Sequence, residues 1–332
     1  AQRTNKYSYN EHIYAAYVQG TKKLGSVLLK TGLRFENTNM DGHQTIPADT
    51  TFGIKRSDFF PYLYVSRKVM AIAGYELRAF LIARRTITRP AYEYLNPFPR
   101  YVDQYLSEVG NPSLRPQFTN NYEANVSVDD RPIVAVGYNE MTDMFSQVVY
   151  QAAGNSRQTY RTYDNLGSNR EWYVRGLGAI PPGRTYFFVI GGQYNHNVYN
   201  GVYNGLPLSY TRGSWSFFTY QTLKLSKTTQ LVLNGFMRYK GLVQFYELST
   251  FGALNLSVNQ QFFDRKMKVT ISVTDMFFTN KNTFAISQGN VTATGLRQND
   301  TRRVGMNIIY NFGVRKKEDN NFLKQESPEN AR

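Results

Sequence analysis

Residues 89–119 read RPAYEYLNPFPRYVDQYLSEVGNPSLRPQFT, and strand-like sequence lies on both sides of them. The stretch contains Pro90, Pro97, Pro99, Pro112 and Pro116. Proline lacks a backbone N–H and pushes the residue before it into an extended conformation, so the stretch is neither one regular helix nor a central strand. Its many aromatic residues argue against disorder. The sequence therefore predicts a long, packed loop, and loops of this length inside a compact architecture are usually functional.

The segments around this loop alternate between apolar and polar residues, as β-strands do when their two faces meet different environments. Residues 27–36, for example, place Leu29 and Leu33 on one face and Lys30 and Arg34 on the other. The composition agrees, because 26 Tyr, 22 Phe, 25 Gly and 12 Pro are typical of many strands joined by turns. The sequence predicts an all-β fold.

The lengths of the strands and connections favour a membrane barrel over a soluble β-sheet protein. Short turns alternate with long loops, and the expected strands run for about ten to sixteen residues, whereas strands of soluble sandwiches average about five or six. The mean hydropathy of −0.48 does not oppose a barrel, because its strands place half of their residues on a polar lumen. We therefore expect a transmembrane antiparallel β-barrel in the bacterial outer membrane.

About 13 strands are expected within residues 1–313. We expect extracellular loops at about 37–55, 87–117, 142–167, 195–212 and 280–300, and a charged periplasmic extension at 314–332. With short turns in the periplasm, 13 strands place the two ends of the chain on opposite sides of the membrane. A self-contained bacterial barrel has an even strand number and both termini in the periplasm. The chain is therefore expected to be the C-terminal portion of a larger barrel.

The alternation also assigns side chains to the two faces of the expected barrel wall, since apolar residues face lipid and polar residues face the lumen. The residues expected to face lipid are Leu29, Leu33, Leu231, Leu233, Leu254, Val269, Ile271, Ile308 and Phe312. The residues expected to face the lumen are Lys30, Arg34, Arg238, Asn255 and Lys268. The lumen-facing cations either bind an anionic substrate or form an inner wall that is solvated or paired with a plug.

Several function classes lack support. The formal net charge of +15 is scattered among the strands, without the basic helix or zinc spacing of a nucleic-acid-binding protein. His12, His43 and His196 are too widely spaced to suggest a metal site. Neither a G-x-S-x-G motif nor a phosphate-binding loop is present. We therefore expect no enzyme, no cofactor and no nucleic-acid partner.

The chain resembles the C-terminal barrel region of TonB-dependent outer-membrane receptors, in particular the outer-membrane barrel family abundant in Bacteroidota. The residues that carry the resemblance are Arg89-Pro90-x-Tyr92, Leu95-Asn96-Pro97-Phe98, Tyr101-x-Asp103, Gly110-Asn111-Pro112-x-Leu114-x-Pro116-x-x-Thr119, Glu123 and Tyr310-Asn311-Phe312-Gly313. The resemblance implies a barrel of 22 strands around an N-terminal plug, which an inner-membrane energy-transducing protein pulls. This sequence shows no plug, so the plug and the upstream strands are expected as partners outside it. Outer-membrane lipid, lipopolysaccharide and a surface lipoprotein or larger outer-membrane complex complete the expected partners.

Aromatic residues of the loops are the candidates for ligand binding, because an amphipathic ring offers contact area and a polar handle. The candidate set is Tyr92, Tyr94, Arg100, Tyr101, Tyr105, Tyr199 and Tyr203; packing of the loops onto themselves is the alternative role. The first functional hypothesis is a transporter that imports a nutrient. The second is a receptor-like barrel that serves as a scaffold subunit of an outer-membrane protein complex, and the third is a soluble carbohydrate-binding β protein.

Overall fold

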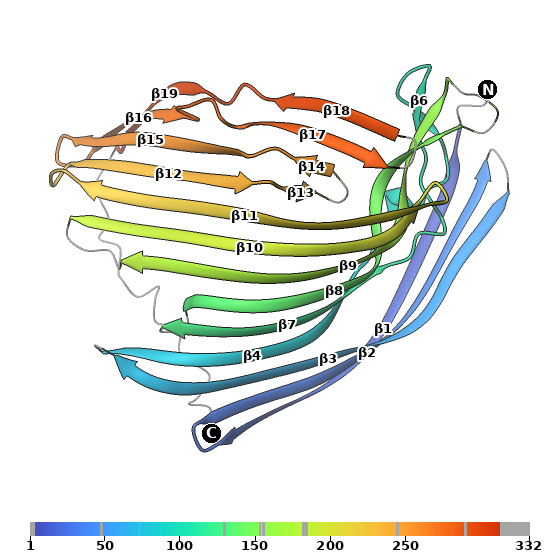
Figure 1. The fold of residues 1–332 in the computed structure, drawn as a ribbon, viewed down its shortest axis with the longest axis horizontal. Helices are drawn as coiled ribbons and strands as arrows, with labels where there is room; N and C mark the ends of the chain where they lie inside the picture. The colour runs from blue at the N-terminus through green and yellow to red at the C-terminus, as the bar shows by residue number, and fades with distance from the viewer. Residues whose placement is uncertain are drawn as a thin grey trace.

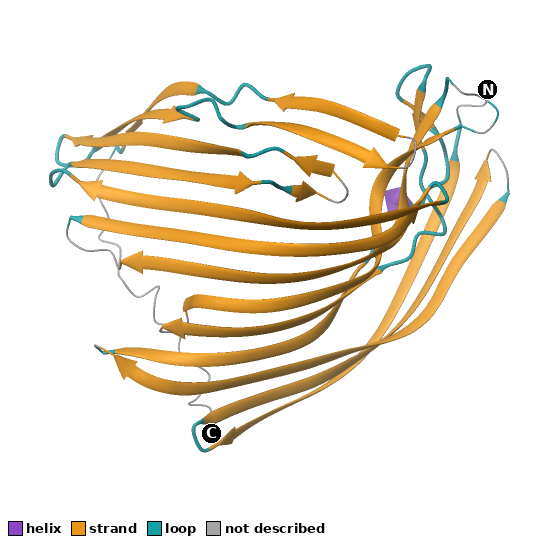
Figure 2. Ribbon diagram, viewed as in Figure 1, coloured by secondary structure: helices purple, strands orange, loops and turns teal. Residues whose placement is uncertain are grey.

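A computed structural model describes residues 4–312 except 47–48, 73, 129–130, 153, 155–156, 181–184, 244–245 and 289–290. The predicted extension at 314–332 lies outside the described residues. Figures 1 and 2 show long antiparallel strands side by side in one strongly curved, open wall. No helix in the described part of the chain is long and apolar enough to span a membrane.

The wall has the strand order β1-β2-β3-β4-β7-β8-β9-β10-β11-β12-β15-β16-β19, so the prediction of about 13 strands is confirmed for the described residues. The strands are β1 (Lys6–Leu24), β2 (Val27–Ile46), β3 (Thr50–Ile72), β4 (Tyr75–Thr88), β7 (Gln117–Val128), β8 (Arg131–Gln151), β9 (Thr159–Ile180), β10 (Tyr186–Tyr203), β11 (Leu206–Lys224), β12 (Thr229–Tyr239), β15 (Phe251–Phe262), β16 (Met267–Thr274) and β19 (Arg303–Tyr310). Among the described residues, β1 and β19 form the two edges and do not pair with each other.

The strand register gives the wall two chemically different faces, because directly opposite residues of antiparallel strands share a face. One continuous row runs from Leu29 through Val65 and Leu81 to Ala124 and onward across the sheet. The adjacent row starts at Lys30 and reaches Glu123 through Tyr64 and Ile82. We call the side that carries Leu29 the outer face and the side that carries Lys30 the inner face.

The positions expected to be long loops are mostly strand, so four of the five predicted loops are wrong in extent. Residues 37–46 and 50–55 belong to β2 and β3, and residues 195–203 and 206–212 belong to β10 and β11. Residues 142–151 and 159–167 likewise extend β8 and β9. These strand ends mix polar and apolar residues on both faces, so they lack the regular alternation that identifies a strand in the sequence, yet their backbones pair with neighbouring strands.

The fifth predicted loop, at 87–117, coincides with the long connection between β4 and β7. Its residues 89–116, which we call the strap, contain the short helix η1 (Tyr92–Tyr94) and the two-strand hairpin of β5 (Arg100–Tyr101) and β6 (Leu106–Glu108). The strap packs against the inner face, because Leu95 and Leu114 form a buried cluster with Met40 of β2. Strand β6 also pairs in parallel with the start of β9. The strap therefore connects two distant parts of the wall.

Residues 281–288 and 291–298 form strands where a loop was predicted at about 280–300. The strands β13 (Leu242–Val243), β14 (Tyr246–Leu248), β17 (Lys281–Gln288) and β18 (Val291–Gln298) make a second sheet in that order. Each follows or precedes one wall strand, β12, β15, β16 or β19, and the order of these four wall strands is the same. Four neighbouring strands are thus interrupted at one level, and the second sheet continues the wall beyond the interruption (Figure 1).

Asp275 holds this interruption together. Its side chain is only 1% exposed, and its carboxylate accepts hydrogen bonds from the Thr301 hydroxyl (2.6 Å) and the backbone amides of Thr279 (2.9 Å) and Asn280 (3.2 Å). Its own N–H donates to Asn255 of β15 at 2.9 Å. Burial opposes ionisation, but the hydrogen bonds outweigh it and hold the pKa of Asp275 below its ordinary value. Asp275 therefore connects β15 with the segments that precede β17 and β19.

We expect Asp275→Ala to lower the free energy of unfolding by about 1.5–3 kcal/mol, since buried donors lose a charged acceptor. The lowered pKa of Asp275 also makes this stabilisation depend on pH. The carboxylate stabilises the fold above the pKa of an unfolded aspartate, and this contribution is lost as the pH falls through the lower folded pKa. Urea unfolding at neutral and acidic pH measures both effects. Asp300→Ala is the control. Asp300 and its partner Arg303 are both exposed and 3.9 Å apart, so their ion pair contributes little to stability. Equal losses in the two variants would contradict the assignment.

Candidate functional site

The inner face of β7–β10 carries a row of linked polar side chains that runs across the strands. The Asn121 amide donates to Asn139 at 2.7 Å, and the Asn139 amide donates to Glu171 at 2.9 Å. The Asn195 amide donates to the other oxygen of Glu171, and Gln193 donates to Asn195 at 2.9 Å. We call these five residues the polar ladder. Strand register creates it, because Asn121, Asn139 and Glu171 are successive cross-strand partners, and Asn195 lies on the same face, two residues from Asn197, the direct partner of Glu171.

A second inner-face cluster lies beside the polar ladder, around Glu123 of β7. Its carboxylate accepts hydrogen bonds from Arg175 at 2.8 Å, from the Tyr173 hydroxyl at 2.5 Å and from Asn125 at 2.9 Å. The Tyr173 ring covers Gly137, where a Cβ atom would lie 2.2 Å from the ring. Polar side chains of this wall are therefore fixed by one another, which reduces the entropy lost when a ligand contacts them.

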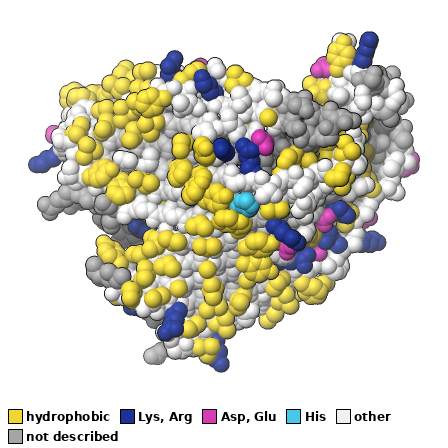
Figure 3. All heavy atoms as spheres, viewed as in Figure 1, with side chains coloured by type: hydrophobic (Ala, Val, Ile, Leu, Met, Phe, Trp, Pro, Cys, Tyr) yellow, Lys and Arg dark blue, Asp and Glu magenta, His cyan; other side chains and the backbone are white. Residues whose placement is uncertain are grey.

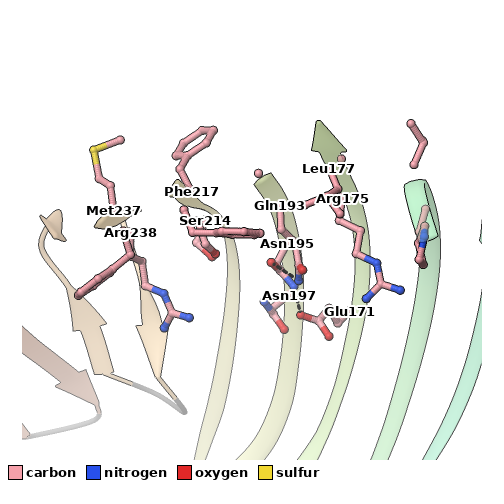
Figure 4. A pocket seen from close by; sticks show the side chains of 18 of the residues that line it. Glu171, Arg175, Leu177, Gln193, Asn195, Asn197, Ser214, Phe217, Met237 and Arg238 are labelled. Atoms are coloured by element: carbon pink, nitrogen blue, oxygen red, sulfur yellow. Dashed lines mark hydrogen bonds between the residues drawn. The ribbon is translucent and has the colours of Figure 1, made fainter. Parts of the chain in front are cut away.

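The polar ladder borders a cavity of about 970 Å³ on the inner face of β8–β12 (Figure 4). Glu171 and Asn195 form part of its lining, and Phe236 and Phe251 add rings whose centroids are 6.1 Å apart. Figure 4 shows Arg238 on the same side as Asn197 and Glu171, whereas Met237 and Phe217 point to the opposite side. No ion pair of Arg238 occurs among the described residues. The cavity thus offers amides, aromatic rings and one cation without a carboxylate partner.

The residues that the sequence assigned to two opposite faces lie on the outer and inner faces of the wall. The outer face carries Leu29, Leu33, Leu231, Leu233, Leu254, Val269, Ile271 and Ile308, and the exposed Phe312 follows the end of β19. The inner face carries Lys30, Arg34, Arg238, Asn255 and Lys268. Figure 3 shows many hydrophobic side chains over the visible face of the wall. That the outer face meets lipid and the inner face a lumen stays a prediction.

The tyrosines and the arginine proposed as ligand contacts fall into two groups. Tyr94 stacks on Tyr163 with centroids 3.8 Å apart, and Tyr199 is 3% exposed in a hydrophobic cluster with Val148, Leu166 and Leu208. The remaining packed member is Tyr203, which stacks on Tyr150. The exposed members are Tyr92, Tyr101, Tyr105 and Arg100, whose guanidinium pairs with Glu108. A binding role remains a prediction for the exposed group, whereas the packed group supports the folded strap and strand ends.

Sequence reasoning missed the polar ladder and most of the cavity. Asn139, Glu171 and Gln193 sit in segments that look like any polar alternation, and only the register between strands brings them together. A metal centre finds no support in the described ranges, where no group of three or more His, Asp or Glu side chains converges.

The curved antiparallel wall, apolar on one face and polar on the other, is the wall of an outer-membrane β-barrel. The sequence matches the model of the outer membrane protein beta-barrel family over residues 1–310. The chain belongs to this family and is a protein of the bacterial outer membrane. The predictions of a transmembrane β-barrel portion and of this location are confirmed by the family.

Solved structures with a similar fold include three from bacteria. The FrpB iron transporter from Neisseria meningitidis has a TM-score of 0.52 and 13% identity, with 91% of this chain and 45% of that chain covered. The siderophore receptor PirA from Pseudomonas aeruginosa has a TM-score of 0.49 and 11% identity, with 81% and 54% covered. A ferric enterobactin receptor (PfeA) mutant from the same organism has a TM-score of 0.49 and 12% identity, with 91% and 53% covered. The chain spans about half the length of these structures. No curated protein matches the sequence.

Proposed function

We propose that this chain forms part of the barrel wall and the extracellular end of a TonB-dependent outer-membrane transporter that imports a nutrient too large for porins. The inner-face cavity carries the proposal, because a wall with a preorganised polar lining and a cation suits capture of a solute from water. All connections between wall strands at one end are two to five residues long, whereas the long strap lies at the other end, so we place the strap outside the cell.

The partners of the transporter follow from this placement. The wall accounts for 13 strands, and the edges β1 and β19 present backbone donors and acceptors that a membrane-spanning sheet must pair. We propose that further strands complete a barrel of 22 strands around a plug, and that a TonB-type energy transducer acts through this plug. Lipid and lipopolysaccharide surround the outer face. A surface lipoprotein at the strap end is a further proposed partner.

The side chains that line the cavity suggest the class of ligand that it would bind. Arg238 lies beside aromatic rings and opposite the amides of the polar ladder, so an anionic solute with a flat apolar part would satisfy the cation and pack against the rings. FrpB is an iron transporter by its name, and its identity to this chain is 13%. Iron chelates are therefore one class of solute to include in the search.

Nutrient depletion from the medium tests the function. Cells that produce the whole protein and cells that lack it are grown on a defined mixture that contains anionic chelates and oligosaccharides, and mass spectrometry follows each solute. We expect one large solute to disappear only with the producing cells, and a protonophore to stop its disappearance. Identical depletion by the two strains would contradict transport. A large protein complex purified from the same membranes would then favour the scaffold function.

Arg238→Ala is expected to raise the half-saturation concentration for the depleted solute by about tenfold or more, since a charge-assisted hydrogen bond is worth about 1.5–3 kcal/mol. Initial uptake rates at several solute concentrations measure the change. Arg238→Lys should recover part of the affinity. Lys22→Ala is the control, because Lys22 pairs with Leu29 and so lies on the outer face. Unchanged uptake by Arg238→Ala would remove Arg238 from the proposed binding site.

A further inference from the structure

A second hollow lies on the outer face, where β10, β11, β12 and β15 meet the level at which the wall strands are interrupted. Its volume is about 510 Å³. Gly235 and Gly252 form part of its floor, and a Cβ atom on either would lie within 2.6 Å of a backbone carbonyl oxygen. Neither position tolerates a side chain, so the floor stays flat. We call this hollow the outer groove.

The sides of the outer groove are apolar. Phe217 and Met237 are cross-strand partners on the outer face, and Leu254 lies opposite Gly235 on the next strand. Ile190 and Thr219 complete the side toward β10 and β11. The apolar character of this groove suits a hydrocarbon chain, which gains its binding free energy from buried apolar area. Polar or charged ligands would lose hydration along most of the groove.

One end of the outer groove is cationic. Lys281, the first residue of β17, lines the groove, and its ammonium lies 5.5 Å from the centroid of the Phe278 ring. The guanidinium of Arg302 lies 5.0 Å from the same centroid. Both cations are exposed, and neither forms an ion pair in the part of the chain that the structure describes. Lys281 thus brings a cation to the end of the apolar groove, and Arg302 contacts the same ring as Lys281.

The location restricts the occupant. The outer groove is continuous with the outer face that carries Leu231 and Leu254, which we propose to meet lipid. It lies on the strap side of Leu231, because the interruption separates β12 from the second sheet. On the proposed orientation, this is the boundary between the hydrocarbon and the outer surface. An amphiphile of the outer leaflet would place its acyl chain and its anionic group at these two levels.

We propose that the outer groove binds one acyl chain of lipid A, with Lys281 and Arg302 on a lipid A phosphate. The proposal rests on the orientation given under the proposed function, and it adds a lipid site that the transport cycle does not require. Lipid A combines acyl chains with a phosphorylated sugar, so it satisfies the apolar channel and the cations together. Occupation of the groove would also join β11, β12 and β15 to the second sheet across the interrupted strands.

Native mass spectrometry of the whole protein tests the site. The protein is purified in detergent, stripped of lipid and titrated with lipid A, dephosphorylated lipid A or phosphatidylglycerol. We expect one lipid A to remain bound to each protein under conditions in which the other two dissociate. The variant Lys281→Gln with Arg302→Gln should weaken lipid A binding by about tenfold or more, since both charge-assisted contacts to the phosphate are lost.

Two further variants test the apolar groove separately from the cations and provide a control. Thr219→Phe fills the groove without removing a charge, and it should also weaken lipid A binding. Lys227→Gln removes an exposed cation in the short turn at the opposite end of β11 and should leave binding unchanged. Equal binding by wild type, the double variant and Thr219→Phe would overturn the proposal, and so would equal binding of phosphatidylglycerol or dephosphorylated lipid A. Solute depletion measures transport without reference to lipid A, so the two proposals fail separately.

Discussion

Replacing Ile271 by arginine is expected to lower the free energy of unfolding by about 2–4 kcal/mol, the cost of a basic residue on the lipid face near the midplane. Ile271 lies in the middle of β16, pairs with Val258 and Met306 on the outer face and is 51% exposed in this chain. Packing within the chain therefore does not explain why an apolar residue occupies this position. Contact with the hydrocarbon of the membrane would explain it.

Reversible unfolding in urea, from vesicles, measures the Ile271→Arg effect. The matched control is Ser272→Arg, which introduces the same cation one residue further along the same strand, on the inner face. Because the inner face is expected to be hydrated, the control should lose much less stability. Equal losses for the two variants, or an unchanged midpoint for Ile271→Arg, would contradict contact of this face with the membrane.

Leu114→Ala in the strap is expected to destabilise the protein by about 2–5 kcal/mol, as large-to-small substitutions in a closed core do. Leu114 is 0% exposed and lies between Leu95 and Met40, so truncation leaves a cavity where the strap meets β2. The loss should appear first as faster hydrogen exchange in η1 and where β6 pairs with β9, because the buried cluster holds these parts of the strap against the wall.

A matched variant separates packing from a general intolerance of the strap to mutation. Val102→Ala removes apolar atoms from the same segment, but Val102 is exposed, so its stability should change little. If Leu114→Ala and Val102→Ala had the same effect on stability and on hydrogen exchange, the strap would not be held by the buried cluster. The exposed aromatic residues Tyr92 and Tyr101 remain free to contact a ligand in either variant.

The sequence predicted the parts of the fold in which two environments impose a pattern. Where one face is apolar and the other polar, as at Leu29 and Lys30 or Ile271 and Ser272, alternation located the strand and the side on which each residue lies. It also located the strap, because proline at positions 90, 97 and 112 excludes regular structure whatever surrounds it.

The extended strand ends could not be read in the same way. Asn37 and Thr38 lie on opposite faces of β2 and are both polar, so hydrophobic periodicity disappears while backbone pairing with β1 and β3 continues. The second sheet escaped detection for a related reason, since its strands are short and contain polar residues on both sides, for example Thr283 and Asn282 in β17. Pairing with a neighbour determines these strands, and one sequence does not display its neighbours.

The candidate site was predicted only at the level of single residues. Arg238 and Asn255 were placed on the inner face by alternation, but the polar ladder depends on which residue of β8 stands opposite which residue of β9. Register of this kind is set jointly by turns, bulges and packing across the whole sheet. For Tyr199 the sequence left ligand contact and packing open as alternatives, and in the structure its ring packs against Leu208.

The central claim is that the outer face of this wall meets lipid and the inner face meets water. The sequence has no cysteine, so spin labels on single cysteines at positions 267–274 of β16 can report the environment of each residue in vesicles. We predict that labels at Val269, Ile271 and Val273 collide with oxygen dissolved in the lipid, whereas labels at Lys268, Thr270 and Ser272 collide with a water-soluble nickel chelate. Collision rates without a period of two residues, or with the two sets reversed, would contradict the account.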